Sequence, residues 1–428
     1  MKKEIITSKA TGDSCIHVKH SSGLDIYIKE MKGFNKVDAL FGTRYGSINT
    51  MFRTAGQTEY TTVPDGIAHF LEHKLFENEE CGVFELYAKT GAICNAFTSF
   101  DKTCYLFSCS KNYTENLRIL LDFVQKPYFT KENVEKEQGI IGQEIQMTQD
   151  NPDWRLLFNM LKSMYHNHPV KIDIAGTIDS IAQIDADLLY KCYNTFYNLN
   201  NMVLSIAGNI DADEVLAICD ECLKPCEDNG LETVFPDEPD TVVCHEIREK
   251  QPVGMPIFMI GYKCKPSADK KETIRKAVSS TLLSQYINNE ANDMYYSLKE
   301  EGIISSDFFC ELFYSTKSYM AYMFSGSGYQ PDKVRDAIVN ELARILKEGI
   351  PDEDFSRIKK LAYGSLIRQQ TNVAYAANIM INNALADVGV YDIVDMYSEI
   401  TAQDVYNFIK YELTEDRLVL SVIEKDGD

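Results

Sequence analysis

The chain repeats a helix-and-strand segment once, and this repeat constrains its architecture more than any other feature. The segment IDADLLYKCYNTFYNLNNMVLSI, from Ile184, aligns without a gap with ITAQDVYNFIKYELTEDRLVLSV, from Ile400. The matching residues stand 216 positions apart (400 − 184), close to half of the 428-residue chain. They are Ile184 and Ile400, Ala186 and Ala402, Tyr190 and Tyr406, and the Val-Leu-Ser runs at 203–205 and 419–421. The sequence therefore predicts two related halves.

Both halves mix helices and strands in a similar order. Each copy of the repeat reads as an amphipathic helix followed by an apolar strand. We expect strands near 23–30, 255–264, 306–314 and 318–328, a hairpin in 91–110, and helices around 66–90, 131–149 and 272–300. This mixing indicates an α+β fold. A stretch rich in Pro, Gly and acidic residues predicts a linker at 228–250, between an N-terminal half at 1–227 and a C-terminal half at 251–428.

The composition restricts the partners and the compartment. A formal charge of −21 argues against nucleic acid and anionic membrane surfaces and favours neutral or basic ligands. No apolar run of signal-peptide or membrane-spanning length is present, so we expect a cytoplasmic protein. The 12 cysteines are scattered, which favours free thiols. Cys219, Cys222 and Cys226 have metal-like spacing, but a helix end before Pro225 explains them more simply.

The segment GIAHFLEHKLFENEE, residues 66–80, gathers two of the seven histidines around one glutamate. If this segment is helical, His69, Glu72 and His73 project from one face, because positions i, i+3 and i+4 are neighbours on a helix. Two imidazoles one turn apart can bind zinc, and the carboxylate beside them can take a proton from an activated water. This is the inverted form of the HExxH zinc-protease motif. The simpler alternative is a pair of surface histidines with a glutamate neighbour.

A catalytic zinc usually takes three protein ligands, and no other histidine pair is an obvious donor, so we expect a carboxylate as the third. The candidates on the helix at 131–149 are Glu132, Glu135, Glu137 and Glu144. Its apolar stripe consists of Val134, Ile140, Ile141 and Ile145. At about 100° per residue, Glu137 and Glu144 fall on the side of the stripe. Two acids on an apolar face need a cation or a donor, and the pattern leaves both open as ligands.

Four motifs together carry a resemblance to a known family. The order GIAHFLEH, GAICNAFTS, EKEQGIIGQE and HNHPVKIDIAGT resembles the pitrilysin/insulinase family of zinc metallopeptidases, the inverzincins. The family's HxxEH motif is followed by a distant glutamate ligand, and here Glu144 stands 71 positions after His73 (144 − 73). The resemblance therefore implies Zn2+ bound by His69, His73 and Glu144, Glu72 as the general base, and Glu137 as an outer acid that orients a ligand.

The resemblance also implies a fold and a substrate. The fold is two homologous α/β-sandwich halves of the pitrilysin/mitochondrial-processing-peptidase type, which face each other across a closed chamber. GAICNAFTS matches the edge strand onto which an extended peptide adds, with Asn95 and Ala96 near the scissile bond. Phe97 either lines a side-chain pocket there or belongs to the core. His166 and His168 belong to a pattern that similar members carry as a structural turn.

The second half departs from the family pattern. Lys299 stands where many members have an arginine, and Ser305 or Ser306 stands where they have a tyrosine. The sequence therefore resembles the zinc-bearing subunit of two-chain bacterial members, and we expect a homodimer or a heterodimer with a related subunit. We predict a zinc metalloendopeptidase that cleaves extended peptides in an enclosed chamber. The alternatives are a catalytically silent or partner-dependent assembly subunit of a heterodimeric peptidase, and a structural α+β protein without metal.

Overall fold

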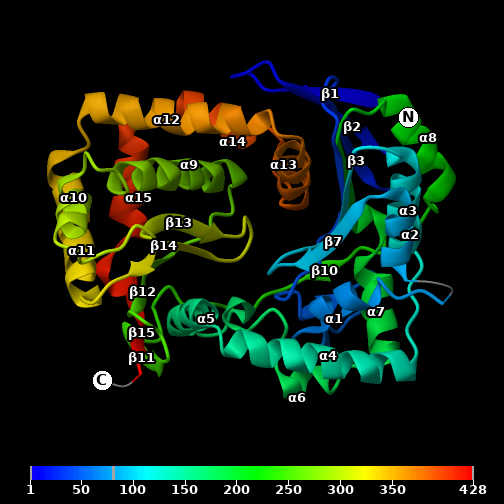
Figure 1. Cartoon of the computed structure of the whole chain (residues 1–428), viewed down its shortest axis with the longest axis horizontal. Coiled ribbons are helices and arrows are strands. Elements are labelled where there is room, and N and C mark those ends of the chain that lie inside the picture. Colours follow the sequence, from blue (N-terminus) through cyan, green and yellow to red (C-terminus); the bar gives the residue numbers. More distant parts are fainter. Residues whose placement is uncertain (1, 80–81, 427–428) are drawn as a thin grey trace. The chain divides into compact units, whose positions relative to one another are not determined.

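The computed structural model describes residues 2–79 and 82–426, which divide into two compact units, each discontinuous in sequence (Figure 1). Unit 1 comprises Met1–Ile145, Asp173–Val234 and Ile367–Tyr391. Unit 2 comprises Gln146–Ile172, Phe235–Leu366 and Asp392–Asp428. The division into halves at 1–227 and 251–428 with a linker between them remains our proposal for the repeat, since the compact units follow the chain differently.

Unit 1 is built on a seven-stranded sheet in the order β1-β2-β3-β9-β4-β8-β7. Its strands are β1 (Lys3–Thr7), β2 (Ser14–Lys19), β3 (Asp25–Glu30), β4 (Val37–Thr43), β7 (Ile93–Thr98), β8 (Thr103–Cys109) and β9 (Met202–Gly208). Only β3 and β9 pair in parallel. A small sheet of β10 (Glu232–Thr233), β5 (Met51–Arg53) and β6 (Thr61–Thr62) accompanies it. Strand β7 lies at one edge, so one side of its backbone is open.

Unit 2 repeats the central part of this topology, which confirms the two related halves. Its sheet has the order β11-β15-β12-β14-β13, and only β11 and β15 pair in parallel. The strands are β11 (Glu246–Gln251), β12 (Ile257–Cys264), β13 (Phe309–Tyr314), β14 (Met320–Ser327) and β15 (Leu418–Lys425). The order therefore matches β3-β9-β4-β8-β7 of unit 1. The repeated segments form equivalent helices and strands, α7 with β9 and α15 with β15.

The helices complete an α+β architecture in both units. Unit 1 contains α1 (Ile67–Lys74), α2 (Val83–Thr90), α3 (Tyr113–Val124), most of α4 (Lys131–Gln149), α6 (Ile178–Ile181), α7 (Ala186–Phe196), α8 (Ala212–Cys222) and α13 (Val373–Leu385). Unit 2 contains α5 (Pro152–Met164), α9 (Lys270–Ile287), α10 (Asp293–Glu300), α11 (Pro331–Glu348), most of α12 (Asp352–Gln370), α14 (Asp392–Glu399) and α15 (Ala402–Glu412). Single 3₁₀ turns lie at Pro169–Lys171, Leu199–Asn201 and Glu415–Arg417.

Each sheet is covered by a helix that comes from the other half of the sequence. Helix α13 packs on β9 and β4 in unit 1, and α5 packs on β15 and β12 in unit 2. The hydroxyl of Ser205 donates to the carbonyl of Ala377 at 2.7 Å, and that of Ser421 donates to the carbonyl of Leu156 at 3.1 Å. These two serines are a matching pair of the sequence repeat. The same strand position thus holds the covering helix in both units.

The stretch expected to be one helix over residues 66–80 is shorter in the structure. Helix α1 ends at Lys74, and Glu80 lies outside the described residues, as does Cys81. The expected helix at 272–300 is likewise two helices, α9 and α10. Helix α1 begins after Gly66, whose φ of 88° and close approach to the carbonyl oxygen of Ala175 exclude a Cβ atom.

Candidate metal centre

Helices α1 and α4 bring three of the expected site residues together. Nε2 of His69 lies 3.6 Å from Oε1 of Glu144, and Nε2 of His73 lies 3.5 Å from Oε2 of the same carboxylate. The possible ligand atoms of the three residues all lie within 4.8 Å of one another. The two rings follow each other on one turn of α1, with centroids 4.6 Å apart. Of the four glutamates on α4, Glu144 is therefore the one that joins the histidines.

Glu137 contacts His73 on the side of the ring away from Glu144 and orients this ring. Its Oε1 lies 3.0 Å from Nδ1 of His73, and its side chain is almost fully buried. When Nδ1 carries the proton and donates to this carboxylate, Nε2 keeps a lone pair and points toward Glu144. Burial lowers the pKa of His73, but the hydrogen bond to Glu137 and the charge of Glu72 outweigh it and raise the pKa overall.

His69 is held in its neutral form by its surroundings. Burial and the neighbouring His73 lower the pKa of His69 from 6.5 to about 3. Among the described residues, its buried Nδ1 has no hydrogen-bond partner. A neutral imidazole keeps the lone pair on Nε2 that a metal requires, so the environment of His69 suits a ligand better than a proton carrier.

The donor set fits zinc in both chemistry and spacing. Two imidazole nitrogens and one carboxylate are a common protein ligand set for a catalytic zinc ion with an open position. Ligand atoms bonded at about 2.0–2.1 Å to a tetrahedral ion lie about 3.3–3.4 Å apart. The separations of 3.5 and 3.6 Å between the imidazoles and the carboxylate match that spacing. The group therefore has the donors that such an ion requires, at close to the required spacing.

Glu72 lies between the metal group and the edge strand. Thr98, at the end of β7, donates its hydroxyl to Oε2 of Glu72 at 2.8 Å. Burial raises the pKa of Glu72 above its usual 4.5, although the hydrogen bond from Thr98 opposes this shift. A carboxylate with a raised pKa beside a metal group is suited to take up a proton.

The strand expected to bind peptide is an open edge. Within the part of the chain that the structure describes, β7 pairs antiparallel with β8 alone, and Asn95 is exposed on it. The side-chain oxygen of Asn95 accepts the backbone N–H of Ala96 at 2.9 Å. Phe97 is half-buried and does not belong to the core cluster of the described residues. Its side chain points to the same face as Asn95, because side chains alternate along a strand.

The residues that depart from the family pattern lie in and directly after α10. The ammonium of Lys299 donates to Glu290 at 2.6 Å, and its side chain is 42% exposed. Ser305 and Ser306 follow α10 in the segment before β13. A lysine that is paired at the surface does not reproduce the planar fork of an arginine.

Two further clusters are weaker candidates for a site. Helix α8 ends at Cys222, three positions before Pro225, and Cys226 is exposed, so these thiols lie at a helix end.

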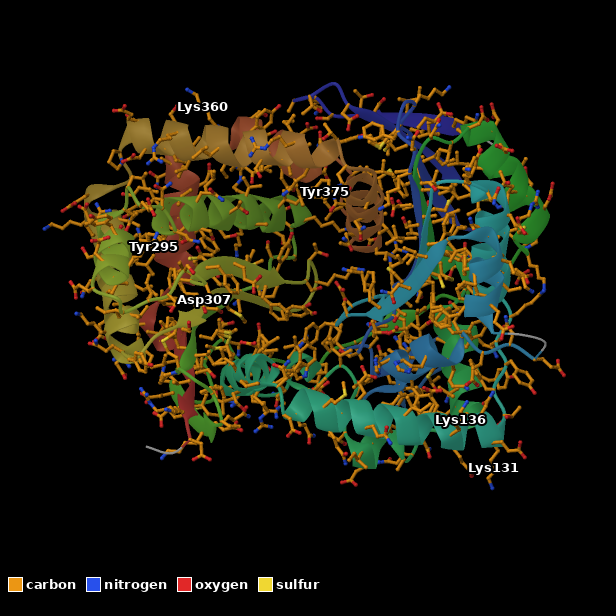
Figure 2. The ribbon with its side chains drawn as sticks, viewed as in Figure 1. Lys131, Lys136, Tyr295, Asp307, Lys360 and Tyr375 are labelled. Carbon is orange, nitrogen blue, oxygen red and sulfur yellow. The ribbon has the colours of Figure 1, made fainter. Side chains whose placement is uncertain are left out.

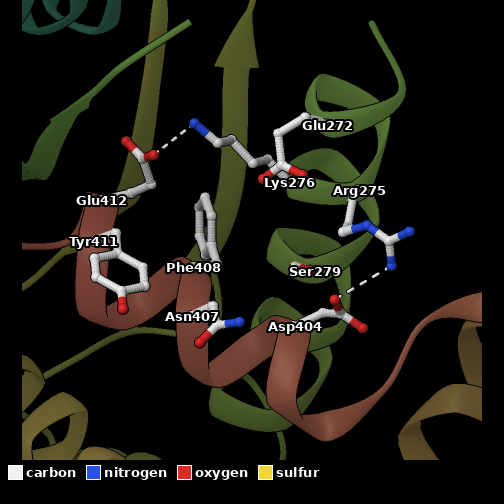
Figure 3. A pocket seen from close by; sticks show the side chains of 9 residues that line it. All are labelled: Glu272, Arg275, Lys276, Ser279, Asp404, Asn407, Phe408, Tyr411 and Glu412. Atoms are coloured by element: carbon white, nitrogen blue, oxygen red, sulfur yellow. Dashed lines mark hydrogen bonds and ion pairs between the residues drawn. The ribbon is translucent and has the colours of Figure 1, made fainter. Parts of the chain in front are cut away.

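A cavity of about 410 Å³ between α9 and α15 is lined by charged residues (Figure 3). Its cations Arg275 and Lys276 already bind Asp404 and Glu412, respectively. The His69–His73–Glu144 group therefore has the stronger claim.

The sequence interpretation missed two side chains next to the metal group. Thr98 stands within the motif GAICNAFTS, but no pattern links it to Glu72. Lys74 is fully buried on α1 and follows His73 directly. Its position on the buried stripe of the helix, at i+7 from Ile67, is the signal that could have identified it.

Comparison with known proteins identifies the family. Residues 54–178 match Insulinase (Peptidase family M16), and residues 183–362 match Peptidase M16 inactive domain. An uncharacterized zinc protease, YmfH, of Bacillus subtilis (strain 168) is 41% identical over 418 residues, which cover 96% of this chain and 97% of that protein. This chain belongs to the insulinase family, peptidase family M16.

Solved structures agree with the two-unit fold. The crystal structure of a putative M16-like peptidase from Alicyclobacillus acidocaldarius is 33% identical, has a TM-score of 0.91, and is matched over 99% of this chain and 98% of that one. A protease from Helicobacter pylori shares the fold with a TM-score of 0.80 at 17% identity, over 99% of both chains. Within residues 2–79 and 82–426, no helix has both the length and the apolar character needed to cross a membrane.

Proposed function

We propose that this protein is a zinc-dependent endopeptidase that cleaves peptides bound in extended form. His69, His73 and Glu144 hold the zinc ion, Glu72 is the general base, and Glu137 orients His73. The observation that carries the proposal is the convergence of two imidazole side chains and one carboxylate, whose possible ligand atoms lie within 4.8 Å of one another, with a buried glutamate on the same helix turn. The zinc-protease names of the relatives support the choice of metal.

In this mechanism, a zinc ion held by His69, His73 and Glu144 would supply Lewis-acid chemistry, which would polarise the scissile carbonyl and lower the pKa of water. Glu72 accepts the proton of the attacking water and then delivers it to the leaving amine. Thr98 donates its hydroxyl to Oε2 of this carboxylate and thereby orients it. Glu137 keeps His73 in the tautomer that leaves Nε2 free.

The substrate adds to β7 as a further strand. In an antiparallel pair, alternate residues direct their backbone groups away from the partner strand. The N–H of Ala96 donates to the side-chain oxygen of Asn95 in this structure. When a peptide binds, this N–H donates to the peptide backbone instead. Thr98 lies two residues along the same strand, so the scissile bond comes to lie beside Glu72. Phe97 contributes to a pocket for a substrate side chain.

A second chain completes the catalytic machinery. Lys299 and the serines at 305 and 306 lack the geometry to bind a developing oxyanion as an arginine and a tyrosine would. We propose that a related subunit, or a second copy of this chain, supplies these groups. We further propose that the protein acts in the cytoplasm, on neutral or basic peptides, because of its net charge of −21.

The test separates metal binding from chemistry. Glu72→Gln should abolish peptide cleavage and retain zinc, whereas His69→Ala and Glu144→Ala should lose zinc as well. Glu135→Gln, a charge-matched change at an exposed position of α4, is the control and should change neither. Cleavage by the Glu72→Gln variant at the wild-type rate would refute the proposed base.

The second candidate function is a silent assembly subunit, which the missing arginine and tyrosine favour. That function predicts one equivalent of zinc and no turnover, either alone or after the addition of any related subunit. Zinc analysis and peptide-cleavage assays of the chain, alone and with co-purified partners, distinguish the two.

A further inference from the structure

A lysine occupies a core position directly beside the metal group. The apolar residues Ile67, Phe70 and Leu71 form the buried stripe of α1, and Lys74 continues it at the position i+7. Its side chain is 0% exposed. A lysine is almost never fully buried unless it is paired, since the removal of an ammonium from water costs several kcal/mol. The sequence thus places a charge where a leucine or methionine would stabilise the fold at lower cost.

The buried ammonium joins α1 to the first turn of α4. Nζ of Lys74 donates to Oε2 of Glu77 and, at 3.3 Å, to the backbone carbonyl of Asn133. The other oxygen of Glu77 lies 3.7 Å from Nζ of Lys136 on α4 (Figure 2). The side chain of Lys136 is 69% exposed, so this second ion pair is weak.

These contacts lie one helical turn before the contact that orients His73. In an α-helix, the carbonyl of residue 133 also accepts the N–H of residue 137. Lys74 therefore holds the turn that carries Glu137, while the adjacent His73 donates to the carboxylate of Glu137. Two neighbouring residues of α1 are thus attached to two points of α4 that are one turn apart.

Two points of attachment fix the rotation of α4 about its axis as well as its distance from α1. Glu144 follows Glu137 by seven residues, which is about two turns, so it projects from nearly the same side of the helix. A rotation of α4 would swing this carboxylate away from the imidazoles, since the ligand atoms are only 3.5 and 3.6 Å apart. We infer that Lys74 is a positioning residue that sets the rotation of α4 and thereby presents Glu144 to His69 and His73. This role rests on the proposed zinc site.

Lys74→Met tests this inference, because methionine fills a similar volume without the charge or the donors. Glu77 is 33% exposed and retains Lys136, so its carboxylate can turn to solvent and the variant can fold. We expect zinc affinity, measured by competition with a chelator, to fall about 10–100-fold, as for other outer-shell partners of metal ligands. The visible absorption spectrum of the Co2+-substituted variant should change as well. The metal-free variant should unfold at a temperature no lower than that of the wild type.

Lys136→Met is the matched control, since it removes the exposed cation on the same carboxylate and should leave zinc affinity unchanged. If Lys74→Met fails to fold, Glu77→Gln replaces it and should also weaken zinc binding. Wild-type zinc affinity and an unchanged cobalt spectrum in the folded variant would overturn the inference alone. A wild-type chain that binds neither metal would instead overturn the proposed function, and the inference with it.

Discussion

The hydroxyl of Thr98 donates a hydrogen bond of 2.8 Å to Oε2 of Glu72. Thr98 ends the edge strand β7, and Glu72 stands between the two histidines of α1. The hydroxyl also lies 3.2 Å from that of Thr103, which in turn donates to the carbonyl of Tyr45 at 2.8 Å. A chain of hydrogen bonds thus ties the proposed base to the sheet that would bind the peptide.

The first prediction is that Thr98→Val lowers kcat more than it changes KM. Valine has the same shape, but it cannot donate the side-chain hydrogen bond that Thr98 makes to Oε2 of Glu72. A hydrogen bond to a charged group contributes about 1.5–3 kcal/mol, which corresponds to about 10–150-fold in kcat. Zinc content should not change, because Thr98 contacts none of the three ligands. Steady-state kinetics with a peptide substrate measure the effect.

Thr98→Ser is the matched control for this prediction, since serine keeps the hydroxyl and should restore most of the rate. A valine variant with wild-type kcat would show that the orientation of Glu72 does not depend on this bond.

The local part of the metal site and the repeat could be predicted from the sequence alone. His69, Glu72 and His73 could be placed on one face because a helix fixes their spacing, and the identical residues 216 positions apart showed two related halves. Helical periodicity alone could not separate Glu137 from Glu144, because both project from the same side of α4. That choice depends on how α4 packs against α1, which is a tertiary contact between distant segments.

The sequence could not predict that α13 covers the sheet of unit 1 and α5 the sheet of unit 2. The physical reason is the same, since each placement is a tertiary contact between distant segments. Both helices follow the preceding helix closely in the chain, and nothing in their own periodicity tells which sheet they cover. The matching serines 205 and 421 were visible in the sequence as a repeat. Their hydrogen bonds to Ala377 and Leu156 become meaningful only once the helices are in place.

The second prediction concerns removal of the metal. A ligand that binds only the folded state stabilises it by about 2.7 kcal/mol at a concentration one hundred times its Kd. A chelator should therefore lower the Tm of the wild type measurably. The same chelator should leave the Tm of Glu144→Ala unchanged, because that variant has no zinc to lose. An equal shift in both proteins in differential scanning calorimetry would argue against Glu144 as a ligand.

The third prediction is a loss of stability in mild acid that depends on His168. The ring is 1% exposed and stacks on Phe235, with centroids 5.1 Å apart. Burial lowers the pKa of His168 from 6.5 to about 4, and the nearby Lys263 adds to this while Glu238 opposes it. Between these pKa values the unfolded chain binds a proton that the folded chain rejects. The contribution is therefore complete above pH 6.5 and declines as the pH falls toward 4, by about 3 kcal/mol at most.

Thermal unfolding at pH 7 and pH 5 checks this expectation in the wild type and in His168→Gln. The variant should show a smaller drop in Tm between the two pH values, even if its Tm at pH 7 is lower. Burial raises the pKa of Glu238, but Lys263 and three backbone N–H donors outweigh it and lower this pKa from 4.5 to about 2. The contribution of Glu238 to stability is therefore lost only below pH 4.5. An unchanged drop in the variant would assign the acid sensitivity to other groups.

The last prediction compares two glycines that occupy the same position in the two sheets. Gly42 pairs with Val203 and Gly261 pairs with Val419, and these valines are a matching pair of the repeat. A Cβ on Gly42 would lie 2.7 Å from the sulfur of Cys104 and 3.0 Å from a methyl of Leu385 on α13. These side chains are buried and short, so Gly42→Ala should destabilise by about 1–3 kcal/mol through overpacking.

A Cβ on Gly261 would meet the ends of Met160 and Met164 on α5, at 3.0 and 2.4 Å. Methionine ends have several rotatable bonds and can move aside, and alanine restricts the unfolded chain more than glycine does. Gly261→Ala should therefore cost less than Gly42→Ala. Urea denaturation of both variants measures the two free energies of unfolding. If the order were reversed, α5 would have to be packed more rigidly on its sheet than α13, and the flexibility of the methionines would not be what accommodates the substitution.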